Sequence, residues 1–285
     1  MQPEAGRHVD AVLAGQERCA LVVADAVELL DGLPRGSVDL IFADPPYKLS
    51  NGGTTCRGGK RATVDKGAWD ASEGLHADHA WHTRWLAAAQ RALKPSGTIW
   101  VSGTQHVIYS LGWAMQTLGF HILNTVTWFK PNASPNLSCR FFTHSTELVI
   151  WAAPGRGKKL THTFQYPRLR AANGDKQVRD AWEIEPDGEG ALWDLPAASR
   201  GERREGSHPT QKPIALLDRI VTSSSSALDL VVDPFNGAGT SGVAALKHGR
   251  RYVGGDIDNA WLELTARRLR AAGVHTHQIG GTNVG

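Results

Sequence analysis

Short apolar segments alternate with helix-like segments along most of the chain, and this alternation restricts the fold more than any other feature. Seven apolar runs of strand length occur, at 20–24, 38–43, 98–102, 122–129, 147–152, 228–232 and 251–255. Between two of them, residues 81–93 repeat apolar side chains at helical spacing, and Pro95-Ser96-Gly97 predicts a turn. Apolar strands joined by helices are typical of a mostly parallel sheet that is covered on both faces. The sequence therefore predicts an α/β fold.

Composition excludes several classes of protein. Of 285 residues, 41% are hydrophobic and 21% are charged, as in ordinary globular proteins. No apolar run reaches the roughly 18 residues of a membrane span, and residues 1–10 are too charged for a secretory signal. The three cysteines form no Cys-x-x-Cys pair, which disfavours a disulfide framework or a thiolate zinc site. We expect a cytoplasmic protein with no membrane partner.

One segment interrupts the alternation. Residues 154–207 contain seven glycines, many charges and few apolar runs. We therefore expect an inserted subdomain at 154–207, between a first part of the main domain at 1–153 and a second part at 208–285. The net charge of +3 permits a polyanionic partner but is weak evidence for one.

A glycine-rich turn follows the apolar run at 228–232. Residues 233–242 read Asp-Pro-Phe-Asn-Gly-Ala-Gly-Thr-Ser-Gly, which matches the G-x-G-x-x-G pattern between a strand and a helix. Asp256 lies 19 residues after Gly237, the spacing of an acid that binds a ribose hydroxyl. This predicts an adenosine-containing cofactor. Asp233 and Phe235 suit an ammonium and a sulfonium better than a pyrophosphate, so a nicotinamide oxidoreductase is the weaker alternative.

The tetrapeptide Asp44-Pro45-Pro46-Tyr47 follows the strand predicted at 38–43, at the edge where α/β sheets hold their ligands. The two prolines fix two φ angles and remove two N–H donors, so Asp44 and the Pro45 carbonyl are expected as rigid acceptors beside the Tyr47 ring. Two acceptors next to a flat ring suit an amine on a flat base. The tetrapeptide therefore predicts methyl transfer to the exocyclic amine of a base flipped out of its duplex.

Together, Asp44-Pro45-Pro46-Tyr47 and Asp233-Pro234-Phe235-x-Gly237-x-Gly239-Thr240 resemble the motifs of the DNA amino methyltransferases that use S-adenosylmethionine. The tetrapeptide comes first, and His208-Pro209-Thr210-Gln211-Lys212-Pro213 precedes the glycine turn, which resembles the circularly permuted beta class. The similarity extends from about Val22 to Leu269, except for 154–207. It implies a Rossmann-like, mostly parallel seven-stranded sheet with an inserted target-recognition subdomain, S-adenosylmethionine as cofactor and double-stranded DNA as substrate.

The resemblance also implies roles for residues. It implies catalysis by Asp44, Pro45, Pro46 and Tyr47, with Asp25 at the cofactor's adenine and Lys212 at its carboxylate. For 128–132 and 144–147 it implies a place in the fold but no chemical role. The cofactor-binding residues that it implies are Asp25, Ala26, Asp44, His208, Thr210, Gln211, Lys212, Asp233, Pro234, Phe235, Asn236, Gly237, Gly239, Thr240, Asp256 and Ile257.

Asp at the head of the tetrapeptide is usual for the adenine N6 enzymes that this chain resembles, and cytosine N4 is the alternative. Methylation at carbon 5 of cytosine is disfavoured, because it needs a thiolate after a proline and none of Cys19, Cys56 and Cys139 follows one. A DNA-binding regulator without catalytic activity is a further alternative, against which the intact tetrapeptide argues.

Two basic segments are expected to contact DNA phosphates, with a solvated surface as the alternative for each. The glycine-rich stretch 48–70 carries five cations against two carboxylates, and the insertion begins with a run of cations without acids. The cations are Lys48, Arg57, Lys60, Arg61, Lys66, Arg156, Lys158, Lys159, Arg168 and Arg170.

Three histidines and ten tryptophans complete the candidates. His76, His79 and His82 drift around a helix, so no metal site is expected. Most tryptophans, including Trp81, Trp85, Trp100, Trp113 and Trp151, are expected in the core, whereas Trp182 and Trp193 are candidates for base or dimer contacts. The resemblance also implies a homodimer, and a cognate restriction endonuclease stays open.

Overall fold

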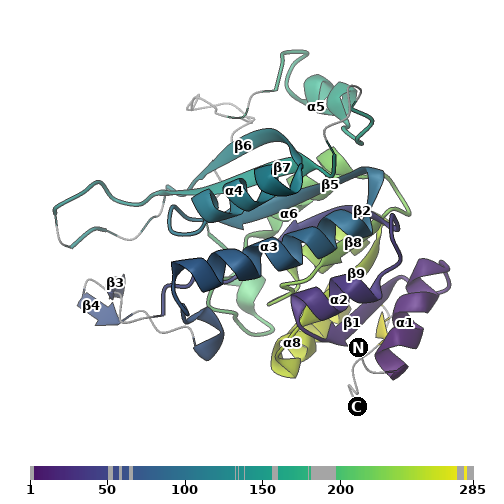
Figure 1. Ribbon diagram of the computed structural model, residues 1–285, viewed down its shortest axis with the longest axis horizontal. Coiled ribbons are helices and arrows are strands. Elements are labelled where there is room, and N and C mark those ends of the chain that lie inside the picture. Colours follow the sequence, from purple (N-terminus) through teal and green to yellow (C-terminus); the bar gives the residue numbers. More distant parts are fainter. Residues whose placement is uncertain are drawn as a thin grey trace.

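The computed structural model describes residues 3–50, 54–57, 60–63, 67–131, 133, 135–137, 139–155, 160–178, 180, 197–274 and 279–280. Helices cover both faces of a central sheet (Figure 1). The strands are β1 Cys19–Val23, β2 Val38–Ala43, β3 Thr54–Arg57, β4 Lys60–Thr63, β5 Leu93–Gly103, β6 His121–Phe129, β7 Thr146–Ala153, β8 Leu230–Asp233, β9 Arg251–Asp256 and β10 Ile279–Gly280. The α-helices are α1 Pro3–Leu13, α2 Ala26–Gly32, α3 Leu75–Ala92, α4 Ile108–Leu118, α5 Tyr166–Ala172, α6 Ile214–Ser224, α7 Thr240–Lys247 and α8 Asn259–Ala271, and the short 3-10 helices are η1 Ala68–Asp70 and η2 Gly201–Arg203.

The sheet confirms the seven predicted strands and adds the two-residue β10 at one edge. Its order is β10-β1-β9-β8-β2-β5-β7-β6. Strands β1, β9, β8, β2 and β5 pair in parallel, whereas β7 is antiparallel to both β5 and β6. The predicted turn at 95–97 lies within β5, where the pairing with β2 is irregular. There Gly97 approaches β2 so closely that a Cβ would lie 2.8 Å from the Val38 carbonyl oxygen.

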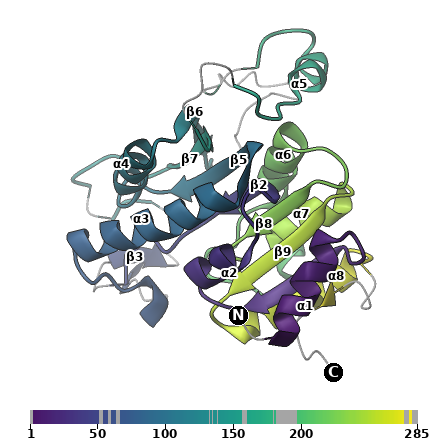
Figure 2. The same cartoon turned by 45° about the vertical axis from the view of Figure 1, so that its right-hand side comes forward.

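Alternate residues of each inner strand enter two hydrophobic cores, one on each face of the sheet. In β2, Ile41 and Ala43 face one core, while Leu40 and Phe42 face the other. Helices α1 to α4 cover the first face and α6 to α8 cover the second, and Figure 2 shows the two layers from the side. This double burial explains why the strands read as continuous apolar runs rather than as alternating patterns. No helix among the described residues is long and apolar enough to cross a membrane.

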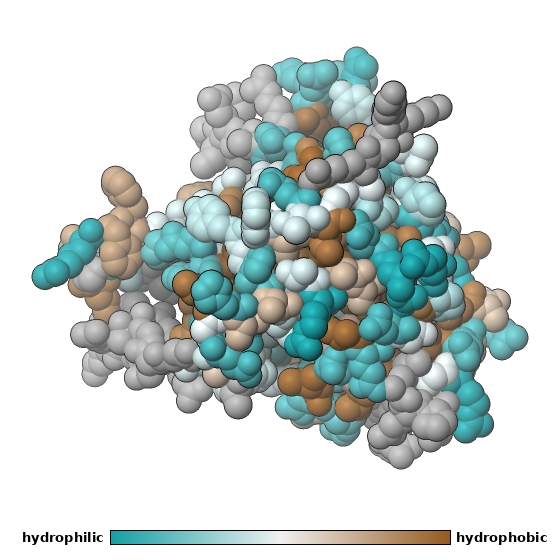
Figure 3. Space-filling model, in the orientation of Figure 1, coloured by the Kyte–Doolittle hydropathy of each residue, from teal (hydrophilic) through white to brown (hydrophobic). Residues whose placement is uncertain are grey.

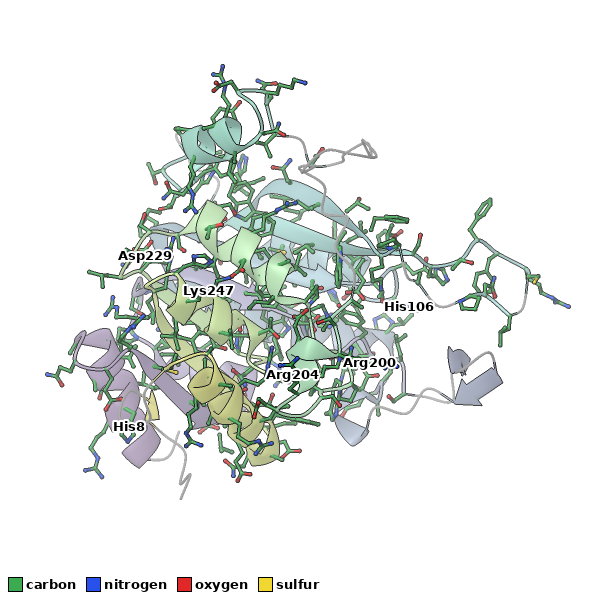
Figure 4. All side chains as sticks on the ribbon, turned by 180° about the vertical axis from the view of Figure 1, so that it is seen from behind. His8, His106, Arg200, Arg204, Asp229 and Lys247 are labelled. Atoms are coloured by element: carbon green, nitrogen blue, oxygen red, sulfur yellow. The ribbon has the colours of Figure 1, made fainter. Side chains whose placement is uncertain are left out.

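The strand directions define two edges of the sheet. At the carboxyl edge, β2, β8 and β9 end, so Asp44, Asp233 and Asp256 meet there. Strand β6 also ends there, because it is antiparallel to β7, which is in turn antiparallel to β5. The amino edge lies opposite. Figure 4 shows the two edges, with His106, just after β5, at the carboxyl edge and Asp229, just before β8, at the amino edge.

The segment 154–207 starts at the amino edge, because β7 ends there. The Thr163 and Gln165 amides donate to the carbonyls of Ser96 and Ser223, and α5 follows. Its last part returns to the carboxyl edge, where the Gln211 side chain donates to the Glu202 carbonyl at 3.0 Å. Trp182 and Trp193 lie outside the described residues.

One expectation about the core is wrong. Trp113 is 63% exposed, and Tyr109, one helical turn earlier on α4, is 75% exposed. Helix α4 buries its other side, including Leu111 and Met115, against the sheet. Spacing alone did not distinguish the two sides, because both carry large apolar residues.

Candidate active site

A cavity of about 720 Å³ opens at the carboxyl edge of the sheet. Its lining includes every residue predicted for catalysis or cofactor binding except Gly239. Gly239 instead begins α7 with φ +66°, and a Cβ there would collide with the Thr265 side chain. Gly239 therefore lets the turn pack closely on α8, and its contact with a cofactor stays a prediction. The volume is in the range of small-molecule sites.

The Asp44 carboxylate lies at the centre of a hydrogen-bonded network in this cavity. Its Oδ1 accepts a hydrogen bond of 2.8 Å from the Tyr47 hydroxyl, and its Oδ2 accepts one of 2.5 Å from the Lys212 ammonium. Lys212 is buried, and burial alone would lower its pKa, but Asp44 and Glu147 raise it, so the ammonium keeps its charge. The resemblance places Lys212 at a cofactor carboxylate, whereas the structure places its ammonium against two carboxylates of the protein.

Glu147 is the second carboxylate, and no role was predicted for it. It starts β7 and accepts from the Tyr47 hydroxyl at 3.1 Å and from the Lys130 ammonium at 2.8 Å, while its Oε2 lies 3.6 Å from Lys212 Nζ. Burial alone would raise the pKa of Glu147, but Lys212 and Lys130 hold it down at about 2. The residue lies within the 144–147 segment singled out from the sequence, but the sequence does not reveal that two lysines face it.

The Tyr47 ring lines the cavity while its hydroxyl is held from three sides. Besides Asp44 and Glu147, the Ser102 hydroxyl of β5 lies 3.0 Å away. Burial and the two carboxylates raise the pKa of Tyr47 well above its usual value, so the phenol stays protonated. The Lys212 ammonium lies 5.3 Å from the ring centre. Only 6% of Tyr47 is exposed, so a base that stacks on it has a limited area of the ring to contact.

Asp233, at the end of β8, holds the glycine turn. Its Oδ1 accepts from the Phe235 amide at 2.9 Å, and its Oδ2 accepts from the Ser241 hydroxyl at 2.5 Å. Burial is the main cause that raises the pKa of Asp233 to about 7. Both oxygens therefore have partners within the protein, and contact with a cofactor ammonium stays a prediction.

Asp256 closes the other side of the glycine turn. Its Oδ2 accepts from the Gly237 amide at 2.8 Å, and its Oδ1 accepts from the Asp258 amide at 3.1 Å. Burial raises its pKa. Nearby, the exposed Asp25 caps α2 by accepting from the Glu28 amide at 2.9 Å. The structure thus brings Asp25, Asp256 and the glycine turn to one end of the cavity.

The segment 208–213 forms a third wall. The His208 ring packs edge-on against Trp261, with 4.5 Å between ring centres. Gln211 is buried, and its Oε1 has no hydrogen-bond partner among the described residues. A buried acceptor without a donor costs free energy, so a ligand with a donor at this position would stabilise the wall.

The tetrapeptide is continued by a clamped turn. Asp70, fully buried in η1, accepts from the Lys48 amide at 2.8 Å and from the Ser50 hydroxyl at 2.9 Å. The Lys48 ammonium donates to the Ala71 carbonyl at 3.1 Å and lies 5.2 Å from the Trp81 ring centre. Lys48 thus lines the cavity, and its ammonium already contacts protein groups, whereas the ammonium of an exposed lysine would be available to a phosphate. Trp81, expected in the core, also lines the cavity.

The structure spreads the other predicted DNA contacts widely. Arg57, Lys60 and Arg61 lie in the β3–β4 hairpin. Arg168 and Arg170 belong to the segment that starts at the amino edge, so the structure does not bring them to the cavity. Lys66, Arg156, Lys158 and Lys159 lie outside the described residues.

The histidines predicted not to bind metal are joined by hydrogen bonds. His79 and His82 both lie within 3.1 Å of the Ser110 hydroxyl, and burial lowers the pKa of His82 to about 4. Within the described part of the chain, no group of three metal-ligating side chains is present. Cys19 is buried at the amino edge, away from the cavity.

Comparison with known proteins identifies the family. A sequence profile of the family described as "DNA methylase" matches residues 38–267. The Type II methyltransferase M2.LlaDCHI of Lactococcus lactis subsp. cremoris is 44% identical over 254 residues, which cover 89% of this chain and 90% of that protein. This chain belongs to the DNA methylase family. It is an enzyme that transfers methyl groups to DNA.

Two solved structures share the fold of this methylase. The M1.HpyAVI–SAM complex matches with a TM-score of 0.59 and 22% identity, covering 88% of this chain and 98% of that chain. The PvuII DNA methyltransferase, described as cytosine-N4-specific, matches with a TM-score of 0.66 and 18% identity, covering 88% of this chain and 86% of that chain. At these identities the likeness concerns the architecture alone.

Proposed function

We propose that this methylase transfers a methyl group from S-adenosylmethionine to the N6 amine of an adenine flipped out of duplex DNA. The observation that carries the proposal is the Asp44 carboxylate, which is held by Tyr47 and Lys212 at the rim of a cavity wide enough for a base and a cofactor. A rigid acceptor at this position can orient an exocyclic amine.

The cavity fits the proposed cofactor. Gln211 supplies a buried acceptor to which no described residue donates, so an amino or hydroxyl group of a ligand could donate to it. Asp256 lies where the spacing of the glycine turn puts a ribose acceptor, and Asp25 lies next to it for an adenine. S-adenosylmethionine would supply an electrophilic methyl group on its sulfonium. The relative M1.HpyAVI has been solved with this cofactor, which further supports the proposal.

The chain's own residues would act on the amine. Asp44 and the Pro45 carbonyl would accept hydrogen bonds from its two hydrogens and direct its lone pair toward the methyl group. An amine that approaches Asp44 competes with Lys212 for the same carboxylate. Because Glu147 lies 3.6 Å from the Lys212 ammonium, it offers a second counter-ion when Asp44 turns to the amine. Tyr47 would support the base with the exposed part of its ring.

The finer assignments also belong to this proposal. The order of the motifs supports the circularly permuted beta class, and the relative's designation as a type II methyltransferase supports a restriction endonuclease as cognate partner. We also propose a homodimer, and a target-recognition role for 154–207 between the catalytic parts 1–153 and 208–285. Contact between Glu202, near the end of this segment, and Gln211, which lines the cavity, supports the last role.

Analysis of the methylated nucleoside tests the base. Duplex DNA of mixed sequence would be incubated with the enzyme and S-adenosylmethionine carrying a labelled methyl group, then digested to nucleosides. The proposal predicts N6-methyldeoxyadenosine as the labelled product. N4-methyldeoxycytidine would refute the choice of base and leave the family intact, and the likeness to the PvuII enzyme makes that outcome worth measuring.

A further inference from the structure

The connection between β6 and β7 is far longer than the pairing of the strands requires. The two strands pair up to Phe129 and Thr146, and the Lys130 amide extends the ladder to the Ser145 carbonyl. Residues 130–145 are named here the β6–β7 arm, and its described residues project beyond the sheet (Figure 1). Hairpin connections usually take 2 to 5 residues, and much longer ones are commonly functional.

The arm exposes large apolar side chains. Phe142 is 96% exposed, Phe141 is 57% exposed and Leu137 is 49% exposed. Hydrophobic side chains are visible on the protrusion at the left of Figure 3. Large apolar side chains that are exposed together often mark a surface that binds another molecule.

Side chains of the arm also contact one another and the loop after β5. The Asn136 side chain donates to the Phe141 carbonyl at 2.6 Å, and the Phe141 ring packs on His144 with 5.2 Å between ring centres. His144 in turn lies 3.4 Å from the Gln105 side chain of the loop after β5. These contacts hold the root of the arm and leave Phe142 outside.

The charge of the arm indicates which kind of molecule it binds. Residues 130–145 contain no Asp or Glu. Of their two cations, Lys130 pairs with Glu147 and the other is Arg140. A segment without carboxylates does not repel a polyanion, and a cation on it attracts one. Aromatic rings on a basic, acid-free segment fit nucleic acid, because every base presents a face on which a ring can stack.

Position relates the arm to the catalytic network. The arm leaves the sheet at the carboxyl edge, as the catalytic tetrapeptide does. Its first residue, Lys130, and the Glu147 that follows its end are bonded to each other and, through Glu147, to Tyr47. A nucleic acid whose base reaches Asp44 must therefore pass close to the root of the arm.

We infer that the β6–β7 arm is a DNA wedge, with Phe142 inserting between base pairs beside the target base and stabilising the flipped state. This inference rests on the proposed function, because it presumes a base that leaves its duplex. Side chains such as Phe are used elsewhere to part base steps. This role differs from that of the cations expected to contact phosphates, because the exposed Phe142 ring supplies stacking and not charge.

The test compares two substrates that differ only in the cost of flipping. One is a duplex with the site that the wild-type enzyme methylates, and the other carries an abasic position opposite the target base. Phe142→Ala should slow single-turnover transfer to the paired duplex about tenfold. Transfer to the abasic duplex should stay at the wild-type rate. Phe142→Trp, which keeps an aromatic ring, should retain the wild-type rate on both substrates.

Leu228→Ala is the matched control, since Leu228 is 73% exposed just before β8 at the amino edge. It should leave both rates unchanged. Equal rates for Phe142→Ala and the wild type on the paired duplex would overturn the wedge, as would an equal loss on both substrates. A change in oligomeric mass on Phe142→Ala would overturn it in favour of a second copy. Absence of N6-methyldeoxyadenosine from mixed-sequence duplex treated with the wild-type enzyme would instead refute the proposed function.

Discussion

Two Asp-Pro turns end adjacent parallel strands of this methylase, and they differ in the groups that their carboxylates face. Asp44, after β2, faces the cavity and pairs with a lysine that a second carboxylate also contacts. Asp233, at the end of β8, is 3% exposed and accepts from the amide and hydroxyl of its own turn. The same dipeptide at the same edge therefore serves two purposes.

The difference lies in the residue after each proline. After Asp44-Pro45, a second proline withholds a backbone donor, so the carboxylate depends on side chains, those of Tyr47 in the same tetrapeptide and of Lys212 from far along the chain. After Asp233-Pro234, the Phe235 amide and Ser241 of the next helix satisfy the carboxylate locally. A carboxylate that is satisfied locally on both oxygens stabilises the turn, whereas one that pairs with a distant lysine can exchange it for a substrate.

The largest expected effect comes from removing the exchangeable carboxylate. Asp44→Ala should lower the single-turnover rate of methyl transfer about 10³-fold, because the target amine loses its oriented acceptor. The rate would be measured with excess enzyme over labelled duplex. A rate for Asp44→Ala above a tenth of the wild-type rate would contradict a catalytic role for the Asp44 carboxylate.

A smaller effect is expected at the carboxylate that shares Lys212. Glu147→Gln should lower the free energy of unfolding by about 3 kcal/mol, because the buried Lys212 and the half-buried Lys130 lose a counter-ion. It should also slow transfer, since Lys212 would then compete for Asp44 without an alternative partner. Unfolding in urea and the single-turnover rate would be measured on the same preparation.

Asp218→Asn is the control for Glu147→Gln. Asp218 pairs with Lys247, whose side chain is 55% exposed, at 2.7 Å. A pair of this kind is worth less than about 1 kcal/mol. A loss of stability on Glu147→Gln no larger than that on Asp218→Asn would show that the buried network is not held by its charges.

The smallest change in activity is expected from Asp233→Asn, which retains an acceptor for the turn. Its signature is the pH dependence of stability. The pKa of Asp233 is about 7 in the fold and 3.8 in its ordinary state, so its contribution to stability is present below pH 4 and is lost as the pH rises to 7. The wild type should therefore lose stability relative to Asp233→Asn over this range. Parallel curves of unfolding free energy against pH would contradict the buried placement of Asp233.

Much of this architecture could be predicted from the sequence, because burial on both faces leaves a pattern in the strands. All seven strands that appeared as apolar runs are present, and the acids that follow four of them line one cavity. The length of a strand and the identity of the residue after it are local properties. The sequence records them directly.

Contacts between distant segments were not predicted. Lys212 meets Asp44 across 168 positions of the chain, and Glu147 meets Tyr47 across 100. Their pairing depends on the order of the strands in the sheet, which places β7 beside β5 and the segment after 208 beside β2. The prediction that Trp113 lies in the core was wrong for a related reason, since its spacing fits a buried helix face as well as an exposed one.

The central claim is that one Asp-Pro turn acts in catalysis and the other in holding the cofactor loop. Titration calorimetry of S-adenosylmethionine on Asp44→Ala and Asp233→Ala, with transfer measured at saturating cofactor, tests it most directly. The account predicts that Asp44→Ala binds the cofactor nearly as the wild type does but does not transfer. It predicts that Asp233→Ala binds weakly and transfers once saturated. The reverse pattern, with affinity lost at Asp44 and transfer lost at Asp233, would contradict it.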